Sequence, residues 1–301
     1  MRCCPTPRLL LLLGLSSCAL AQPQQTASLG DGAGLLPTSH PSLNASSTHM
    51  SGLLAALAPT VGRNRMQLPS VSDALRPRLD TSDPSSDQPS ACPAGMVLVE
   101  GMYCPEVDQK CTRWLETGGR YAYYRCAEYA RPARCLAPRK HLRFCIDRDE
   151  FVPPGDSLPA SHQSWTQATQ TCGSLGKRVC MESEYNFACE GEEMRPYPYG
   201  FTRDSDACNA DRTDIYRADG QLLDLRDGPS GHPRCVSPFG VHDLAGNLEE
   251  WTTIDGTSPP RPAMKGAYWQ PSRNHCRAAQ TAHDTHYSGV ETGFRCCKDA
   301  D

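Results

Sequence analysis

Apolar and aromatic residues, from which a hydrophobic core is built, gather in the last two-thirds of the chain. No Phe, Trp or Tyr occurs between Gln22 and Met102. The apolar run Met96–Val99 is typical of a short strand. His141–Asp147 alternates polar and apolar residues with period two, which predicts a further strand. Pro153–Asp156, a Pro-Pro-Gly-Asp turn, ends that region.

Two helices are expected after this turn. Ser164 is a candidate N-cap, and Trp165, Ala168 and Cys172 follow at spacings that place them on one helix face. Glycines at positions 173 and 176 end this helix. A second helix is predicted over Glu182–Cys189, with Tyr185, Ala188 and Cys189 facing inward.

The remainder is predicted to be loops and short strands. Residues 190–240 are mostly Gly, Pro, Asp and Arg, which favours long ordered loops. Loops of this length in a compact domain need cross-links, and we expect Cys208 to pair with Cys235 for that reason. Short strands are predicted at Ala263–Trp269 and at Gly293–Cys297. Cys104–Cys145 is basic and rich in cysteine, and we expect it to form loops.

The N-terminus has the pattern of an export signal. Arg2 and Arg8 are followed by the apolar run Leu9–Leu15, which is too short to span a bilayer. Two interpretations remain open. The signal peptide covers residues 1–21 and is cleaved after Ala21, or residues 15–18 form a bacterial lipobox and Cys18 becomes a lipidated membrane tether. The location is therefore periplasmic, outer-membrane-anchored or secreted.

Composition separates a linker from a cross-linked domain. Residues 22–91 are rich in Ser, Pro and Ala, contain no cysteine, and are predicted to be a disordered linker. Fourteen of the 17 cysteines lie between Cys92 and Cys297. In an exported chain they predict up to seven disulfides, with a zinc-thiolate site as the alternative. The net charge of −4 and the lack of a basic patch give no sign of nucleic-acid binding.

Four segments of the chain resemble, in order, the formylglycine-generating-enzyme (sulfatase-modifying factor) domain family. The Trp165–Val179 segment resembles that family's tryptophan helix and G-K-R-L turn, and Glu182–Cys189 resembles its E-A-E-W-E-Y-A helix. Phe239–Trp251 resembles its G-L-Y-D-M-x-G-N-V-W-E-W signature. Lys265–Trp269, together with the later motifs Cys276-Arg277 and Gly293–Cys296, resembles its closing segment. The domain is thus expected over residues 92–301, with the best-matched core at 141–297.

The resemblance implies a C-type-lectin-like α+β fold with two main helices, short strands and long loops held by disulfides. It also implies the pairs Cys172–Cys296 and Cys189–Cys276. The partner of Cys180 is not inherited from the family, because the family usually has Pro there.

The family's oxidising chemistry uses two cysteines that hold copper(I), for which soft thiolates are suitable ligands. They lie between the closing strand and the closing Cys-Arg step, an interval that is Gln270–His275 here and contains no cysteine. Copper is therefore not expected. Cys297 directly follows Cys296, and we interpret it as part of a further structural disulfide.

Two other metal sites were considered. Some relatives with this domain are iron enzymes, and His275, His283 and His286 with Asp284 could form an iron triad, although Thr281–Gly289 has the character of an exposed loop. Calcium is better supported. The resemblance implies that Asp243, Gly246, Leu248 and Glu250 bind calcium through two side chains and two carbonyls, unless this is a plain structural turn.

A second calcium site of the family uses an asparagine that corresponds to Asn209, with Asp224 or Asp227 as the later acid. The resemblance and the missing cysteines together predict an exported, non-oxidising recognition module, stabilised by calcium, for a protein, peptide or glycan ligand. The alternative is a formylglycine-generating-type or non-haem iron oxidoreductase that acts on a peptide or small molecule.

Overall fold

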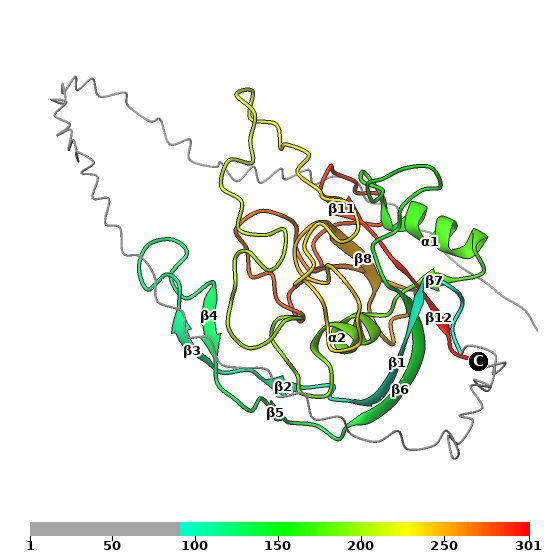
Figure 1. Cartoon of the computed structure of the whole chain (residues 1–301), viewed down its shortest axis with the longest axis horizontal. Coiled ribbons are helices and arrows are strands. Elements are labelled where there is room, and N and C mark those ends of the chain that lie inside the picture. Colours follow the sequence, from blue (N-terminus) through cyan, green and yellow to red (C-terminus); the bar gives the residue numbers. More distant parts are fainter. Residues whose placement is uncertain (1–90) are drawn as a thin grey trace, which may run out of the picture. The chain divides into compact units, whose positions relative to one another are not determined.

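The computed structural model describes residues 91–301, coloured from cyan to red in Figure 1. The predicted signal peptide, the candidate lipidation at Cys18 and nearly all of the predicted linker lie outside the described residues. The described part combines two helices with four small sheets, which is an α+β architecture.

The first sheet is built on two long antiparallel strands. Its order is β1-β6-β12-β7, formed by Met96–Tyr103, Lys140–Asp147, Cys296–Asp299 and Arg178–Val179. β1 pairs with β6 along its whole length, from Met96 opposite Asp147 to Tyr103 opposite Lys140. The two strands run side by side along one edge of the domain in Figure 1. The strands predicted at 96–99 and 141–147 are confirmed, and both are longer than expected.

Both predicted helices are present. α1 spans Trp165–Ser174, and its N-cap Ser164 accepts a hydrogen bond from the backbone N–H of Gln167, whose side chain accepts one from Ser164 in return. α2 spans Glu182–Glu190 and buries seven of its nine residues between the sheets and the loops. Neither helix of residues 91–301 has the length and apolar character needed to cross a membrane.

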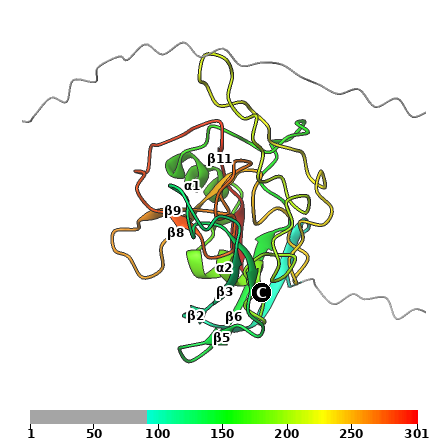
Figure 2. The same cartoon turned by 90° about the vertical axis from the view of Figure 1, so that its left-hand side faces the viewer.

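The second sheet has the order β10-β9-β8-β11, formed by Ala279–Gln280, Pro262–Lys265, Glu249–Thr253 and Thr292–Gly293. The orange loop between β8 and β9 projects from the body in Figure 2. β9 ends four residues before the predicted strand does, because Gly266 and Ala267 adopt positive φ angles of 81° and 55° that no strand contains.

The prediction of one strand over Gly293–Cys297 is wrong. Thr292–Gly293 belongs to the second sheet, whereas Cys296–Asp299 belongs to the first. Phe294 and Arg295 lie between the two strands. Their side chains are buried in the core, and each is 1% exposed. Hydrophobic periodicity cannot reveal this change of sheet, because both halves are buried.

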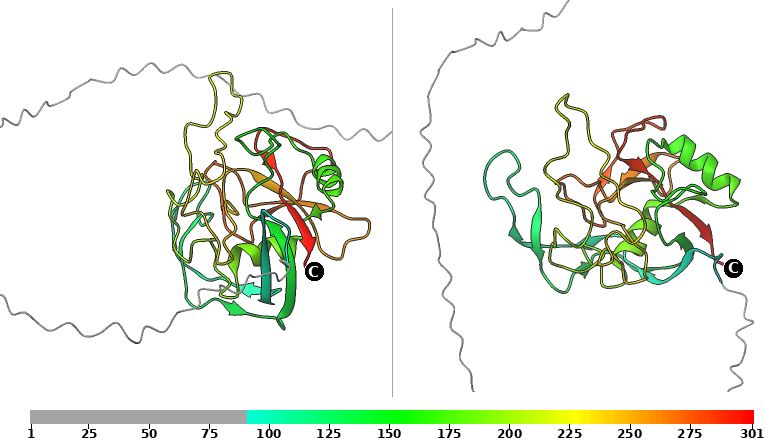
Figure 3. Two further views of the ribbon diagram at one scale, coloured as in Figure 1. Left: turned by 45° about the vertical axis from the view of Figure 1, so that its right-hand side comes forward. Right: turned by 45° about the horizontal axis from the view of Figure 1, so that its top comes forward.

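The prediction of loops over Cys104–Cys145 is also wrong in part. β2 (Val107–Asp108) pairs with β5 (Arg134–Cys135), and β3 (Cys111–Trp114) pairs with β4 (Cys126–Tyr129). The β3–β4 hairpin projects from the domain, clearly so in the right-hand view of Figure 3. Two disulfides hold these short strands together, a stabilisation that a strand-propensity argument does not include.

The fourteen cysteines from Cys92 onward form seven disulfides. The bridges are Cys92–Cys145, Cys104–Cys135, Cys111–Cys126, Cys172–Cys296, Cys180–Cys297, Cys189–Cys276 and Cys208–Cys235. They include the two pairs implied by the family resemblance, the pair expected from loop length, and a partner for Cys180. No thiolate of the described residues is left for a zinc site, so the zinc alternative is wrong.

Residues 191–248 contain no helix and no regular strand, which confirms the loops predicted over 190–240 except at Glu190, the last residue of α2. The yellow-green part of this stretch rises above the rest of the domain in Figure 1. Cys208–Cys235 closes the middle of this segment, and both cysteines are buried. The second sheet positions the site described next.

Candidate functional site

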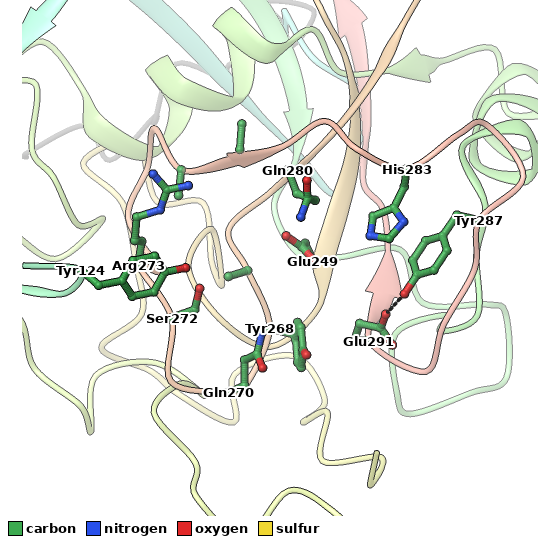
Figure 4. A pocket seen from close by; sticks show the side chains of 13 residues that line it. Tyr124, Glu249, Tyr268, Gln270, Ser272, Arg273, Gln280, His283, Tyr287 and Glu291 are labelled. Atoms are coloured by element: carbon green, nitrogen blue, oxygen red, sulfur yellow. Dashed lines mark hydrogen bonds between the residues drawn. The ribbon is translucent and has the colours of Figure 1, made fainter. Parts of the chain in front are cut away.

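A polar cavity of about 230 Å³ opens beside the second sheet. Residues from four segments line it: the β3–β4 hairpin, β8, the loop that follows β9, and the stretch from β10 to β11. Figure 4 shows Glu249 in the middle of the view, with Tyr287 and Glu291 on one side and Arg273 with Tyr124 on the other. A concave site with several converging polar groups is the usual form of a small-ligand site.

The backbone of the second sheet brings two carboxylates to this cavity. Glu249 begins β8 and pairs with Thr292, the first residue of the parallel strand β11. The backbone N–H of Glu249 donates a hydrogen bond to the carbonyl oxygen of Glu291, at 2.9 Å. Both side chains line the cavity. Glu249 and Glu291 are thus neighbours across two strands although 42 positions separate them in the sequence.

Burial and a neighbouring carboxylate set the electrostatics of Glu249. Burial, and then the negative charge of Glu291, raise the pKa of Glu249 to about 7. The Tyr287 hydroxyl donates a hydrogen bond to Glu291 Oε1 at 2.7 Å. Within residues 91–301 no Lys, Arg or His forms a salt bridge with either carboxylate, and the Glu249 carboxylate accepts no hydrogen bond.

The opposite side of the cavity carries a cation. The Arg273 guanidinium lies 5.7 Å from the ring centre of Tyr124, a residue of the projecting β3–β4 hairpin. His283 stacks on Tyr287, with ring centres 3.7 Å apart and planes 19° apart. The cavity therefore has an acidic half on the second sheet and a basic side next to the hairpin.

The cavity occupies the place where the family resemblance would put the redox cysteines. Gln270, Ser272 and Arg273 of the cysteine-free interval line it. Asn274 holds this loop, because its Oδ1 accepts the Ser272 N–H at 3.0 Å and its Nδ2 donates to the Tyr268 carbonyl at 3.0 Å. Polar side chains thus stand where copper-binding thiolates would be needed.

The candidate iron triad does not assemble. Burial lowers the pKa of His275 to about 3, helped by nearby Arg273, and its Nδ1 is buried without a hydrogen-bond partner. His283 stacks in the cavity wall, whereas His286 is exposed. The described part of the chain has no group of three or more His, Cys, Asp or Glu side chains arranged to hold a metal ion. Asp284 caps the exposed loop instead, by accepting the His286 N–H at 2.8 Å.

The predicted calcium motif forms a buried acidic cluster. Burial raises the pKa of Asp243 to about 7, and its carboxylate accepts no hydrogen bond from residues 91–301. Both oxygens of Glu250 bind the Arg295 guanidinium at 2.7 Å, and Tyr185 also contacts Glu250, at 3.3 Å. Gly246 forms the turn between them, with φ 81°.

A third carboxylate, missed by the sequence analysis, completes this cluster. Glu150 Oε1 accepts the Leu248 N–H at 2.9 Å, and Oε2 binds the Asn247 amide. Burial raises its pKa well above the usual range, with a further contribution from Glu250 and then Asp243. Three buried carboxylates share one buried guanidinium, so negative charge is in excess. Arg295 occupies Glu250, so Asp243 is the carboxylate left without a partner, although the three acids do not form a group arranged to hold a metal ion.

The second predicted calcium site is less well assembled. The Asn209 side chain donates to the Leu225 carbonyl at 2.7 Å and to Asn247 Oδ1 at 3.0 Å. Asp224 binds Arg226, and Asp227 binds His232. The structure brings Asn209 to Leu225 and not to either aspartate carboxylate, because both acids have local basic partners.

Sequence reasoning also missed Glu249 and Glu291, the two acids of the cavity. One signal was present: Glu249 stands where the family signature G-N-V-W-E-W has its first tryptophan. A charged residue in place of a large aromatic residue in a buried motif indicates that this position differs in function from that of the family. No such signal was available for Glu291, because only the pairing of β8 with β11 brings it to the site.

Comparison with known proteins identifies relatives of this domain. A family profile described as a sulfatase-modifying factor enzyme 1-like domain matches residues 109–300. The chain is 30% identical over 158 residues to the mouse (Mus musculus) protein named inactive C-alpha-formylglycine-generating enzyme 2, covering 48% of this chain and 50% of that protein. It is 27% identical over 184 residues to the formylglycine-generating enzyme of Thermomonospora curvata, covering 48% and 59%.

The chain thus spans about half the length of the curated relatives it matches. Among solved structures, PvdO from Pseudomonas aeruginosa aligns with a TM-score of 0.45 at 15% identity, covering 70% of this chain and 95% of that chain.

Proposed function

The chain belongs to the sulfatase-modifying factor enzyme 1-like domain family, and we propose that it is a non-oxidising member that acts as an exported recognition module. One observation carries this proposal: the interval Gln270–His275 has no cysteine, and all fourteen cysteines of residues 91–301 are in disulfides. Copper(I) needs soft thiolate ligands, and this domain has none to offer. The mouse relative named inactive supports the same proposal.

The recognition site of this proposal is the cavity of Glu249 and Glu291. Its polar lining and its position beside the projecting β3–β4 hairpin suit a partner that is a protein, a peptide or a glycan. Disulfides form in oxidising compartments, so the seven bridges agree with an exported protein. A lectin-like use of the fold, and a membrane tether through a lipidated Cys18, belong to the same proposal.

Calcium is the proposed structural ion. Asp243 and Glu250 would supply carboxylate oxygens, and Gly246 and Leu248 carbonyl oxygens, which are the hard ligands that calcium prefers. The unpartnered, buried Asp243 supports this assignment, since a bound cation would neutralise it. Arg295 competes with calcium for Glu250, so Asp243 is the ligand whose removal should matter most. Asn209 is proposed for a second site, with the Leu225 carbonyl beside it.

The proposal is tested by measuring thiols and oxidation together. Purified protein denatured without reductant should show no free thiol among the residues from Cys92 onward. Supplied with copper(I), oxygen and a cysteine-containing peptide, it should neither consume oxygen nor convert the peptide thiol. Stoichiometric free thiols with copper-dependent peptide oxidation would overturn the proposal and favour an oxidoreductase.

Calcium binding has its own test. Calcium should raise the melting temperature, and a concentration of 100 times Kd should add about 2.7 kcal/mol to the free energy of unfolding. Asp243→Asn should abolish this response. Glu249→Gln, which removes an acid of the cavity and not of the calcium motif, is the matched control and should keep it. An equal calcium response in Asp243→Asn would contradict the assignment.

A further inference from the structure

Glu249 and Glu291 line one cavity, and within residues 91–301 neither has a cationic partner. Three other buried glutamates are neutralised by arginine: Glu190 by Arg277 at 2.5 Å, Glu184 by Arg178 at 2.6 Å and Glu250 by Arg295 at 2.7 Å. Glu150 is also buried without a salt bridge, but it accepts hydrogen bonds from the Asn247 amide and the Leu248 N–H, whereas Glu249 accepts none. Burying a carboxylate without a counter-charge is costly, so folded proteins seldom keep one without a reason. The two acids of the cavity therefore carry negative charge that the chain itself does not balance.

The surroundings of these acids suit a cation from outside. The rings of Tyr268 and Tyr287 line the same cavity, and aromatic faces attract organic cations. Tyr287 also holds Glu291 in place through the 2.7 Å hydrogen bond, which leaves Glu249 as the carboxylate without a partner (Figure 4). The cavity volume of about 230 Å³ is sufficient for one side chain and too small for a folded element.

We propose that this cavity binds the basic side chain, lysine or arginine, of a peptide segment of the partner. The proposal rests on the recognition function proposed above and names the ligand class of that site. The ammonium or guanidinium group lies between Glu249 and Glu291, and its alkyl stem lies along the tyrosine rings.

The other charged and titratable groups that face Glu249 are compatible with this ligand. They are Glu291, His283, Tyr287, Tyr268, Arg273 and Tyr124. Arg273 is directed to Tyr124 on the hairpin side, and it makes no salt bridge with Glu249 or Glu291. It is therefore free to hold a carbonyl or an acidic group next to the basic residue of the peptide.

The β3–β4 hairpin favours a peptide over a free amine. Tyr124 lines the cavity, and the same hairpin exposes Tyr121 and Tyr123, at 59% and 61% of their surface. Tyr121 lies against Tyr124, with ring centres 6.0 Å apart. Exposed tyrosines next to a pocket are typical of surfaces that contact a polypeptide. A small amine would fill the cavity and leave this surface unused.

The test measures binding of capped amino acids to the full chain by calorimetry at pH 8. N-acetyl-lysine methylamide or its arginine analogue should bind at least about tenfold more tightly than the norleucine analogue, which has the same stem without the charge. The pentapeptide Ala-Ala-Lys-Ala-Ala should bind more tightly than the capped lysine, and free butylamine more weakly. Tighter binding of butylamine than of the pentapeptide would overturn the peptide assignment.

Two variants locate the site. Glu249→Gln should weaken binding of the basic ligand at least about tenfold. This variant should stay folded, with a higher melting temperature at pH 8, because it loses an unbalanced charge. Glu100→Gln is the control: Glu100 has basic partners, Arg143 and His141, and does not line the cavity, so binding should be unchanged.

The outcomes separate this inference from the proposed function. Binding of norleucine as tight as that of lysine, or no binding of either basic ligand, would overturn the basic-side-chain assignment even if the thiol and oxidation measurements still support a recognition module. Copper-dependent oxidation of a peptide thiol would overturn the proposed function instead, whichever ligand the cavity holds.

Discussion

The most buried ion pair of the domain joins Glu250 to Arg295. Both side chains are at most 1% exposed, and two hydrogen bonds of 2.7 Å connect them. Arg295 also donates to the carbonyls of Asp147 and Arg148, so one guanidinium ties the signature motif to the first sheet. Such a pair adds little net stability compared with an apolar pair, but loss of one partner leaves the other charge stranded.

We therefore expect Arg295→Met to reduce the free energy of unfolding by about 3–5 kcal/mol at neutral pH, measured by urea denaturation. The pKa of Glu250, already raised by burial, should rise further, so the loss should become smaller as the pH is lowered and Glu250 takes up a proton. The double variant Arg295→Met/Glu250→Gln is the control and should recover much of the loss. An equal loss in the double variant would show that packing, and not the stranded charge, is responsible.

At this scale the sequence analysis found some of the acids and missed others. Asp243 and Glu250 lie within one short motif, so their proximity was predictable. Glu150 joins them from about 100 positions away, and Glu291 meets Glu249 only through strand pairing. Contacts of this kind depend on tertiary structure, and no local pattern encodes them.

The disulfides act on different elements according to the length of chain that they close. Cys172–Cys296 joins α1 to β12 across 124 positions, whereas Cys111–Cys126 closes 15 positions within the β3–β4 hairpin. In the chain-entropy model, a disulfide that closes a longer loop stabilises the folded state more. The first bridge thus supports the whole core, and the second supports one projecting hairpin.

Replacing Cys172 and Cys296 by Ala should cost about 5 kcal/mol, which is enough to unfold a domain of ordinary stability. Replacing Cys111 and Cys126 by Ala should cost about 3 kcal/mol at most and should loosen mainly the hairpin. Thermal melts and amide hydrogen exchange would measure both effects. The same global loss for both pairs would contradict this division.

Element prediction succeeded where the signal is local. Ser164 as N-cap, the buried face of α1 and the two long strands all follow from spacing within ten residues. Element prediction failed where pairing with a distant strand or a disulfide determines the structure. The two cases are the change of sheet between Gly293 and Cys296 and the small disulfide-held strands between Cys104 and Cys135.

The molecule as a whole keeps several acids protonated more readily than usual. Burial raises the pKa values of Asp243 and Glu249 to about 7, and that of Glu150 well above its ordinary value. In the unfolded chain such groups titrate near pH 4, so the folded state binds more protons between pH 4 and 7. Stability should therefore fall as pH rises through this range.

We expect the melting temperature to be higher at pH 6 than at pH 8, with roughly 1 kcal/mol from each of Asp243 and Glu249. His275, whose pKa is lowered, opposes this trend only below about pH 6.5, where the unfolded chain begins to take up its proton. The double variant Asp243→Asn/Glu249→Gln should flatten the curve. A curve as steep as that of the original protein would show that other groups control it.

The sequence by itself determined the family, the two helices, the long strands and the use of the cysteines for cross-linking, because each of these follows from local spacing or from residue types in order. Only the tertiary structure decided which acids meet: it left Glu249 and Glu291 together without a cation, and gave Glu250 to Arg295. The physical reason is that charges interact through space, and strand pairing sets those distances.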